Sequence, residues 1–189
     1  NLAGVPTTAH SNLLLNHVAT ADAFVTAKLK QAGAVITGKL STHEFAIGGP
    51  AFDLPFPPAR NPWNLEHHPG GSSSGAGTSV AAGMVPAALG SDTGGSVRNP
   101  ASCCGIVGIK PTYGRVSRRG VIPLSFSLDN VGPLPRTAED NALVLAAIAG
   151  HDPADPASAP RAVDDYLTDL KRGVKGLKVG LIRHFYTHD

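Results

Sequence analysis

The stretch from residue 70 to 98 most strongly limits how this chain can fold, because two glycine-rich turns enclose a run of small side chains. The first turn, "GGSSSG", covers 70–75, and the second, "GSDTGGSVR", covers 90–98. Between them, 75–83 is almost entirely small residues, which predicts a helix packed too closely for larger side chains. Two such turns close together in an apolar segment predict that N–H groups and hydroxyls meet at one site.

Patterns on either side predict helices that alternate with short apolar strands. Helices are predicted over three segments: 20–33, 136–150 and 163–173. Their end signals are Thr20 and Gly33 for the first helix and Thr137, Asp140 and Gly150 for the second. Strands are predicted over four segments: 34–37, 84–90, 105–110 and 177–182. With a proline-rich loop over 48–71 and a surface connector over 151–160, this alternation predicts an α/β fold in one layered domain.

Composition supports this fold class and excludes several partners. The 189 residues are 42% hydrophobic but only 5% aromatic, which predicts one domain with an aliphatic core. The formal charge is only +2, and the tightest basic group (Arg115, Arg118 and Arg119) has no interleaved aromatic residue for stacking on bases. No apolar run reaches the length of a membrane span. We therefore expect neither nucleic acid nor a membrane as a partner.

Other reactive side chains favour structural roles. Cys103 and Cys104 are adjacent, so an ordinary disulfide between them would be strained and they lack metal-ligand spacing. We expect both thiols to be buried and reduced in a cytoplasmic protein. His67 and His68 have no acidic or cysteine partner at ligand spacing, so no metal site is predicted.

The serines carry the chemical hypothesis. A serine nucleophile needs a base within reach and N–H donors aimed at the oxyanion. Residues 71–75 match G-x-S-x-G around Ser73, but a nucleophile elbow follows a strand, whereas a proline-bounded loop precedes Ser73. No lysine follows the glycines as in a phosphate loop. The second turn follows an apolar strand and can direct N–H groups to one point near Ser96, although a plain turn with Ser96 as a helix N-cap fits the residues equally well.

The segment "GGSSSGAGTSVAAGMVPAALGSDTGGSVRNPASCCGIVGIKPTYGRVS" resembles the amidase signature family. That family has a Gly-Gly-Ser-Ser-Gly loop, a small-residue helix and a Gly-Ser-Asp-Thr-Gly-Gly-Ser-[Ile/Val]-Arg turn. The similarity continues through "AGAVITGKLSTHEFAIGG", "ARNPWNLE" and "VGPLPRTAEDNALVLAAIAG", so it spans nearly the whole chain. It implies the amidase signature fold, a mixed central sheet covered by helices, with 1–189 as a single-domain fragment truncated at both ends.

The family uses a Ser, cis-Ser, Lys triad, so the resemblance implies residue roles. Ser96 corresponds to the acylated nucleophile, and Ser72, 24 positions earlier, corresponds to the bridging serine that follows a cis peptide bond at Gly71. The implied oxyanion hole consists of the N–H groups of Thr93, Gly94, Gly95 and Ser96. Supporting roles are implied for Ser73, Asp92 and Arg98, and Phe45–Gly48 is expected to line the acyl side of the pocket.

The lysine is where this sequence departs from the family pattern. In the family it lies on an earlier strand in a Pro-x-x-x-Lys-Asp context, which we expect upstream of Asn1. Lys39 in "TGKL" is therefore given a structural role. The fragment would then carry the nucleophile, the relay and the oxyanion hole without the base, and would be nearly inactive alone.

The resemblance implies an amidase that hydrolyses a small-molecule carboxylic amide through an acyl-serine intermediate, with no metal and no cofactor. One alternative is the glutamine-handling subunit of an amidotransferase that acts on misacylated tRNA, but "GGPAFDLPFP" departs from the Gly-Ser-Ser-Thr-Glu-Asn-Ser stretch expected of that branch. Outside the enzymes, the alternative is a catalytically incomplete binding domain. A homodimer is left open.

Overall fold

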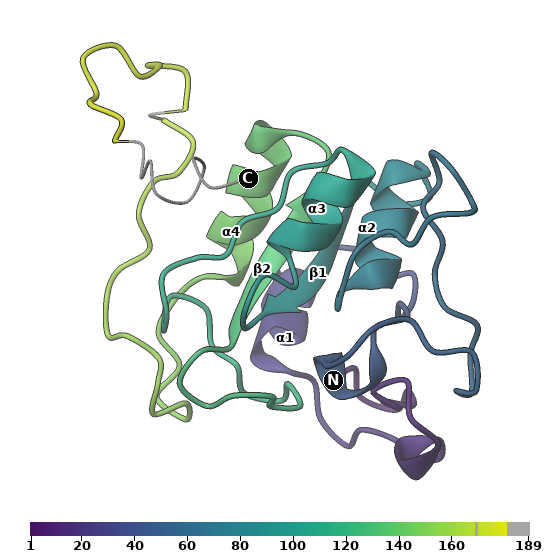
Figure 1. Cartoon of the computed structure of the whole chain (residues 1–189). Coiled ribbons are helices and arrows are strands. Elements are labelled where there is room, and N and C mark those ends of the chain that lie inside the picture. The colour runs from purple at the N-terminus through teal and green to yellow at the C-terminus, as the bar shows by residue number, and fades with distance from the viewer. Residues whose placement is uncertain (169, 181–189) are drawn as a thin grey trace.

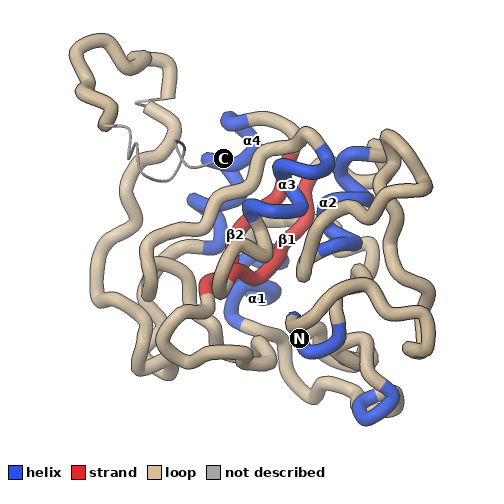
Figure 2. The backbone as a smooth tube through the Cα atoms, in the orientation of Figure 1, coloured by secondary structure: helices blue, strands red, loops and turns tan. Residues whose placement is uncertain are grey.

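A two-stranded antiparallel sheet lies at the centre of the structure, a computed structural model in which residues 1–168 and 170–180 are described. β1 (Ala87–Asp92) pairs with β2 (Asn130–Pro135), and Asp92 lies opposite Asn130 at one end. The described helices are η1 (Asn12–Leu14), α1 (Phe24–Gln31), η2 (Glu44–Ala46), α2 (Ser74–Ala81), α3 (Arg98–Cys104) and α4 (Ala138–Ile148). The predicted sheet covered by helices is present, and Figure 2 shows how much of the chain around it is loop.

The helices cover both faces of the sheet. α2 and α3 lie in front of it in Figure 1, and α1 and α4 lie behind it. The front core includes Val80, Val97 and Leu134, and the rear core includes Val131 and Ile148. Val131 and Leu134 are three positions apart on β2, so they point to opposite faces and each contributes to a different core. The buried hydrophobic side chains are aliphatic, as the composition predicts.

Two predicted helices are present, with bounds within two residues of those expected. α2 is the small-residue helix, and a Cβ on Gly77 would lie 3.0 Å from the Cβ of Pro100 in α3, so small residues allow the two helices to approach closely. α4 begins after Thr137, whose side chain accepts the Asp140 N–H at 3.1 Å. α1 begins later than predicted. Its N-cap is Ala23 rather than Thr20, with no side-chain cap, while Gly33 follows its end with a φ of 81°.

The predicted strand over 105–110 is strand-like without being a regular strand. The Val107 and Ile109 N–H groups donate to the carbonyls of Pro135 and Pro133 on β2. A Cβ on Gly132 would lie 2.1 Å from the Ile109 oxygen, so glycine permits this close approach. The segment adds two ladder-type hydrogen bonds along β2 and then leaves toward Pro111.

The strand predicted over 34–37 is wrong. These residues have no regular secondary structure and no strand partner in the described part of the chain, and Val35 is 87% exposed. Apolar periodicity predicts a conformation but cannot supply the second strand that a sheet requires.

The two C-terminal elements also differ from prediction. The described residues of 163–173 form turns rather than a helix, and Leu177–Gly180 contains no strand. Leu181 and Ile182, the last residues of that predicted strand, lie outside the described residues.

The segment 151–160 is not simply a surface connector. Asp152, Asp155 and Ser158 are buried, and both carboxylates accept the Ser117 hydroxyl hydrogen bond, at 2.9 and 3.1 Å. The polar composition that suggested a surface loop instead serves a buried hydrogen-bond cluster.

Among the described residues, none of the helices combines the length and apolarity needed to span a membrane.

Candidate active site

The turn that carries Ser96 follows the end of β1 and is organised by one carboxylate. Asp92 is fully buried, and its Oδ1 accepts the Gly95 N–H at 2.8 Å and Arg98 Nη2 at 3.0 Å. Its Oδ2 accepts the Val97 N–H at 3.2 Å. The same oxygen accepts two hydrogen bonds from Arg98, one from Nε at 3.0 Å and one from the backbone N–H at 3.3 Å. Burial opposes ionisation, yet the Arg98 guanidinium and the backbone donors hold the pKa of Asp92 below its usual value. The carboxylate therefore fixes the path from Gly95 to Arg98.

The predicted oxyanion donors divide into two groups. The Gly95 N–H is engaged by Asp92, whereas those of Thr93, Gly94 and Ser96 make no hydrogen bond with any described residue. The Ser96 side chain is half-buried, and a Cβ on Gly94 would meet nothing within 4 Å. Unengaged N–H donors beside a hydroxyl are compatible with acyl transfer, which needs donors for an oxyanion.

Ser72 lies in the first turn, with its hydroxyl buried. The peptide bond between Gly71 and Ser72 is cis, as the resemblance implies. Ser72 is 3% exposed, and its Oγ has no hydrogen-bond partner among the described residues. Its carbonyl accepts two hydrogen bonds, from the Thr42 hydroxyl at 2.7 Å and the His43 N–H at 3.0 Å. The backbone of Ser72 is thus anchored while its hydroxyl stays unengaged.

Ser73 links the two turns. Its N–H donates to the Ser96 carbonyl at 3.2 Å, which brings the Ser72 loop directly against the Ser96 turn. Its Oγ donates to the Ser91 carbonyl at 3.3 Å and accepts the Ser91 N–H at 3.2 Å. Ser73 therefore makes hydrogen bonds with the backbone of β1 and is not free as a nucleophile. The residues before it form a loop, which argues against a nucleophile elbow.

The glycines before Ser72 are needed because neighbouring groups approach closely. A Cβ on Gly71 would lie 2.1 Å from the His43 ring, and the Gly71 N–H donates to Asn99 Oδ1 at 2.9 Å. A Cβ on Gly70 would lie 2.7 Å from the same Asn99 oxygen, and Gly70 has a φ of 78°. α3 therefore holds both turns, since it begins at Arg98 and also provides Asn99.

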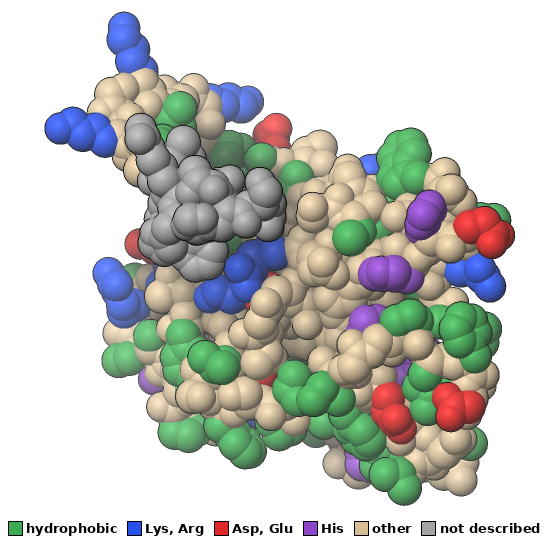
Figure 3. Space-filling view, viewed as in Figure 1, with side chains coloured by type: hydrophobic (Ala, Val, Ile, Leu, Met, Phe, Trp, Pro, Cys, Tyr) green, Lys and Arg blue, Asp and Glu red, His purple; other side chains and the backbone are tan. Residues whose placement is uncertain are grey.

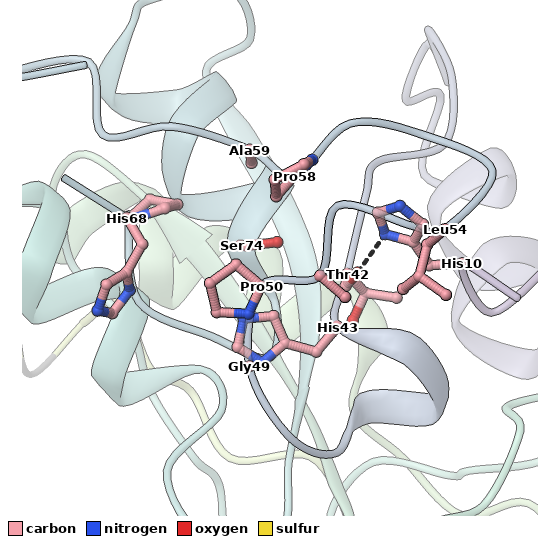
Figure 4. A pocket seen from close by; sticks show the side chains of 12 residues that line it. His10, Thr42, His43, Gly49, Pro50, Leu54, Pro58, Ala59, His68 and Ser74 are labelled. Atoms are coloured by element: carbon pink, nitrogen blue, oxygen red, sulfur yellow. Dashed lines mark hydrogen bonds between the residues drawn. The ribbon is translucent and has the colours of Figure 1, made fainter. Parts of the chain in front are cut away.

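A narrow pocket lies beside the Ser72 loop, and Figure 4 shows His10, His43, His68 and Ser74 around it. The His10 ring nitrogens meet the carbonyl oxygens of Thr42 and Phe56, the second at 2.7 Å. Burial lowers the pKa of His43, and a hydrogen bond with the backbone of Gly48 partly offsets this shift. Several histidines, drawn in purple, gather on this face in Figure 3. Among the described residues, no group of three His, Cys, Asp or Glu side chains could hold a metal ion.

Lys39 lies in a second, larger cavity of about 580 Å³. Its Nζ donates to Thr7 Oγ1 at 2.5 Å, and burial lowers its pKa. Ser91 and Phe45 also line this cavity, so part of the expected Phe45–Gly48 wall faces it. The hydrogen bond of Lys39 connects the segment after 34–37 to the N-terminal segment.

The two cysteines differ from each other. Cys104 is buried, and burial raises the pKa of its thiol to about 11, so it is protonated at neutral pH. Cys103 is exposed, so the expectation that both thiols are buried is wrong. They are neighbours on α3, and only one of the two side chains faces the core.

Several residues that support the turns were not found from the sequence: Thr42, His43, Asn99 and Asp129. They are 28 to 36 positions from the groups they hold. The available signal was that Thr42 and His43 lie within the resembled stretch "AGAVITGKLSTHEFAIGG", and that Asn99 directly follows the Ser96 turn.

Comparisons with known proteins show to which family the chain is similar. The model of the family described as Amidase matches residues 1–189. A curated relative, a glutamyl-tRNA(Gln) amidotransferase subunit from Anaeromyxobacter sp. (strain K), is 56% identical over 182 residues, which are 96% of this chain and 37% of the relative.

Solved structures give the same result. The glutamyl-tRNA(Gln) amidotransferase subunit from Thermotoga maritima matches with a TM-score of 0.88 and 49% identity, covering 93% of this chain and 38% of that chain. A peptide amidase in complex with the competitive inhibitor chymostatin matches with a TM-score of 0.80 and 43% identity, covering 88% and 36%. The predicted fold class is confirmed. The chain spans less than two fifths of the length of these relatives.

Proposed function

This chain belongs to the amidase family, and from that premise we propose that the protein carrying it hydrolyses a small-molecule carboxylic amide through an acyl-serine intermediate. Ser96 is the nucleophile and Ser72 is the relay. Asp92, Arg98 and Ser73 hold the two turns without contacting the substrate. No metal or organic cofactor takes part in this scheme.

The first half-reaction forms an ester at Ser96. The Ser96 Oγ attacks the amide carbon, and the carbonyl electrons move to the oxygen, which the unengaged N–H groups of Thr93, Gly94 and Ser96 stabilise. The Ser96 proton moves to Ser72 Oγ, whose own proton passes to the base. When the tetrahedral intermediate collapses, the C–N bond breaks and the same relay returns a proton to the leaving amine. Water then hydrolyses the ester by the reverse proton path.

The observation that supports this proposal best is the hydroxyl of Ser72. A buried polar group without a partner is destabilising, by about 1 to 3 kcal/mol, so such groups are uncommon in structural roles. Here it lies in a loop that makes a backbone hydrogen bond to Ser96. A hydroxyl that must accept one proton and release another has to remain unengaged by structural partners.

We propose that the base is a lysine outside residues 1–189, because Lys39 makes its hydrogen bond to Thr7. The Ser72 hydroxyl is the group this lysine would meet.

The test is covalent labelling of the full-length protein with a fluorophosphonate, followed by peptide mapping. We expect an adduct on Ser96 that is lost in Ser96→Ala and strongly reduced in Ser72→Ala and in a variant of the upstream lysine. Ser74→Ala is the matched control, since it removes the hydroxyl of a nearby serine at the start of α2. An adduct on Ser73, or no adduct, would contradict the proposal.

A second candidate is the glutamine-handling subunit of an amidotransferase, which is favoured by the 56% identity with a subunit of an enzyme of that name. It predicts glutamine-dependent transfer to a misacylated tRNA and co-purification with partner subunits. Hydrolysis of simple amides by the isolated protein, without either property, would favour the amidase. Absence of both activities from the full-length protein would favour a binding domain.

A further inference from the structure

Thr93 is held by a carboxylate that the sequence motifs do not include. Its Oγ1 donates to Asp129 Oδ1 at 2.5 Å, and Asp129 is buried. Thr93 directly follows β1 and Asp129 directly precedes β2, next to the pairing of Asp92 with Asn130. This hydrogen bond therefore joins the two strands where the sheet ends and the Ser96 turn begins.

The second oxygen of Asp129 holds a neighbouring loop. It accepts the Leu124 N–H at 2.8 Å and the Ser125 N–H at 2.9 Å. The same loop is fixed at Phe126, whose carbonyl accepts the Tyr113 hydroxyl at 2.6 Å and Arg118 Nη1 at 2.8 Å. Asp129 is therefore part of a rigid support and not a side chain that moves freely with Thr93.

The two carboxylates hold different halves of the turn. Asp92 makes hydrogen bonds with Gly95, Val97 and Arg98, which are in the second half. In the first half, Gly94 has no side chain, and its N–H has no partner among the described residues. The Thr93 hydroxyl bond to Asp129 is the side-chain contact that limits rotation of this half.

We propose that Asp129 is a positioning residue for the acylation of Ser96, and that it acts through Thr93 by fixing the direction of the Gly94 N–H in the oxyanion hole. This inference rests on the proposed function, because it assigns a role within that site. Misdirection of one oxyanion donor affects the transition state more than the bound substrate, so the effect falls on kcat.

The experiment compares Thr93→Val, Asp129→Asn and the double variant in the full-length protein. Thr93→Val keeps the side-chain shape and removes only the hydroxyl. We expect each single variant to lower the rate of Ser96 labelling and kcat by roughly 10- to 100-fold with KM within about twofold. Thr93→Ser restores the hydroxyl and should remain within about threefold of the unaltered protein. The double variant should be no slower than the slower single variant, because the proposal lets Asp129 act on the site only through the Thr93 hydroxyl.

The matched control is Thr137→Val, which removes the same kind of hydrogen bond, from Thr137 Oγ1 to Asp140 at 2.7 Å, at the start of α4. It should leave the labelling rate unchanged. A labelling rate in Thr93→Val equal to that in Thr137→Val would overturn the inference. It would also be overturned if the effects of Thr93→Val and Asp129→Asn multiplied in the double variant, because the two residues would then act independently.

Amide hydrogen exchange over 91–98 gives a readout independent of activity. Exchange in this segment should rise at least about tenfold in Thr93→Val and Asp129→Asn but not in Thr137→Val. If the unaltered protein is not labelled at Ser96, the proposed function fails. Unchanged exchange over 91–98 in Thr93→Val and Asp129→Asn would show that Asp129 does not hold the turn, and this result would overturn the inference separately.

Discussion

The Ser96 turn is held mainly by one buried side chain, that of Asp92. Its carboxylate accepts three backbone N–H groups and the Arg98 guanidinium, and its pKa lies below the usual value. A lowered folded-state pKa means that the charged form contributes stability at neutral pH. This contribution is fully present above the unfolded-state pKa of about 3.9 and is lost as the pH falls through the lower folded value.

We expect Asp92→Asn to lower the free energy of unfolding by about 3 kcal/mol at pH 7, because it leaves Arg98 without its partner and disrupts the backbone hydrogen bonds. The difference from the unaltered protein should shrink below about pH 4, as the native carboxylate becomes protonated. Urea unfolding at pH 7, 5, 4 and 3 measures it. Asp22→Asn is the control, because Asp22 pairs with Lys30 at the surface and should matter little. A pH-independent difference for Asp92→Asn would contradict this account.

At this scale the candidate site residues are easier to find in the sequence than the residues that hold them. Ser72, Ser96 and Asp92 belong to contiguous motifs, and the family resemblance points to them for that reason. Asn99 and Asp129 are ordinary polar residues until the fold places them beside partners that are 28 and 36 positions away along the chain. No local pattern encodes such a pairing, because it depends on how strands and helices pack.

Among the elements, β2 shows how one glycine position can decide whether a segment pairs. The 105–110 segment reaches β2 only because Gly132 leaves room for the Ile109 carbonyl. Sequence periodicity predicted strand character there correctly but not the close approach of Ile109 to Gly132. The strand prediction failed at 34–37 because a strand needs a partner, which the spacing of apolar residues does not specify. The helices were predicted more reliably because their hydrogen bonds are internal.

Gly132→Ala should therefore destabilise the protein by about 2 kcal/mol, since the new methyl group would meet backbone that cannot rotate away. Gly38→Ala is the matched control, because nothing lies within 4 Å of the added Cβ. Chemical denaturation gives the free energies, and hydrogen exchange should show loosening over 106–110. Equal stability of the two variants would mean that the approach of Ile109 is not as close as described.

At the scale of the whole molecule, hydrogen bonds connect the segment after α4 to residues 115–119. Asp155 accepts the Arg118 N–H at 2.8 Å and the Ser117 hydroxyl at 3.1 Å, and Asp152 accepts Arg119 Nε at 2.7 Å. Burial opposes ionisation of both carboxylates, but these donors hold their pKa values below the usual range. This arrangement links a loop that composition placed at the surface to the rear core.

Asp155→Asn should lower the free energy of unfolding by about 1 to 3 kcal/mol, because an amide nitrogen would face N–H donors in a buried position. Hydrogen exchange over 151–159 should rise at the same time. Asp165→Asn alters a carboxylate that accepts similar N–H groups in an exposed turn and should change neither measurement appreciably. Unaltered exchange over 151–159 in Asp155→Asn would show that these hydrogen bonds do not hold the segment in place.

The hydrogen bonds that hold Ser72 and Thr93 also determine which part of this chain could be transplanted. A graft limited to 70–98 would include both serines and Asp92 but would leave Thr42 and Asp129 in the donor protein. On a foreign scaffold its two turns would keep their sequence and lose their orientation. Because β1 also needs β2 as its partner, the smallest portable unit runs from about residue 41 to 135, so the motif by which the site is recognised is less than one third of the segment that would have to be moved with it.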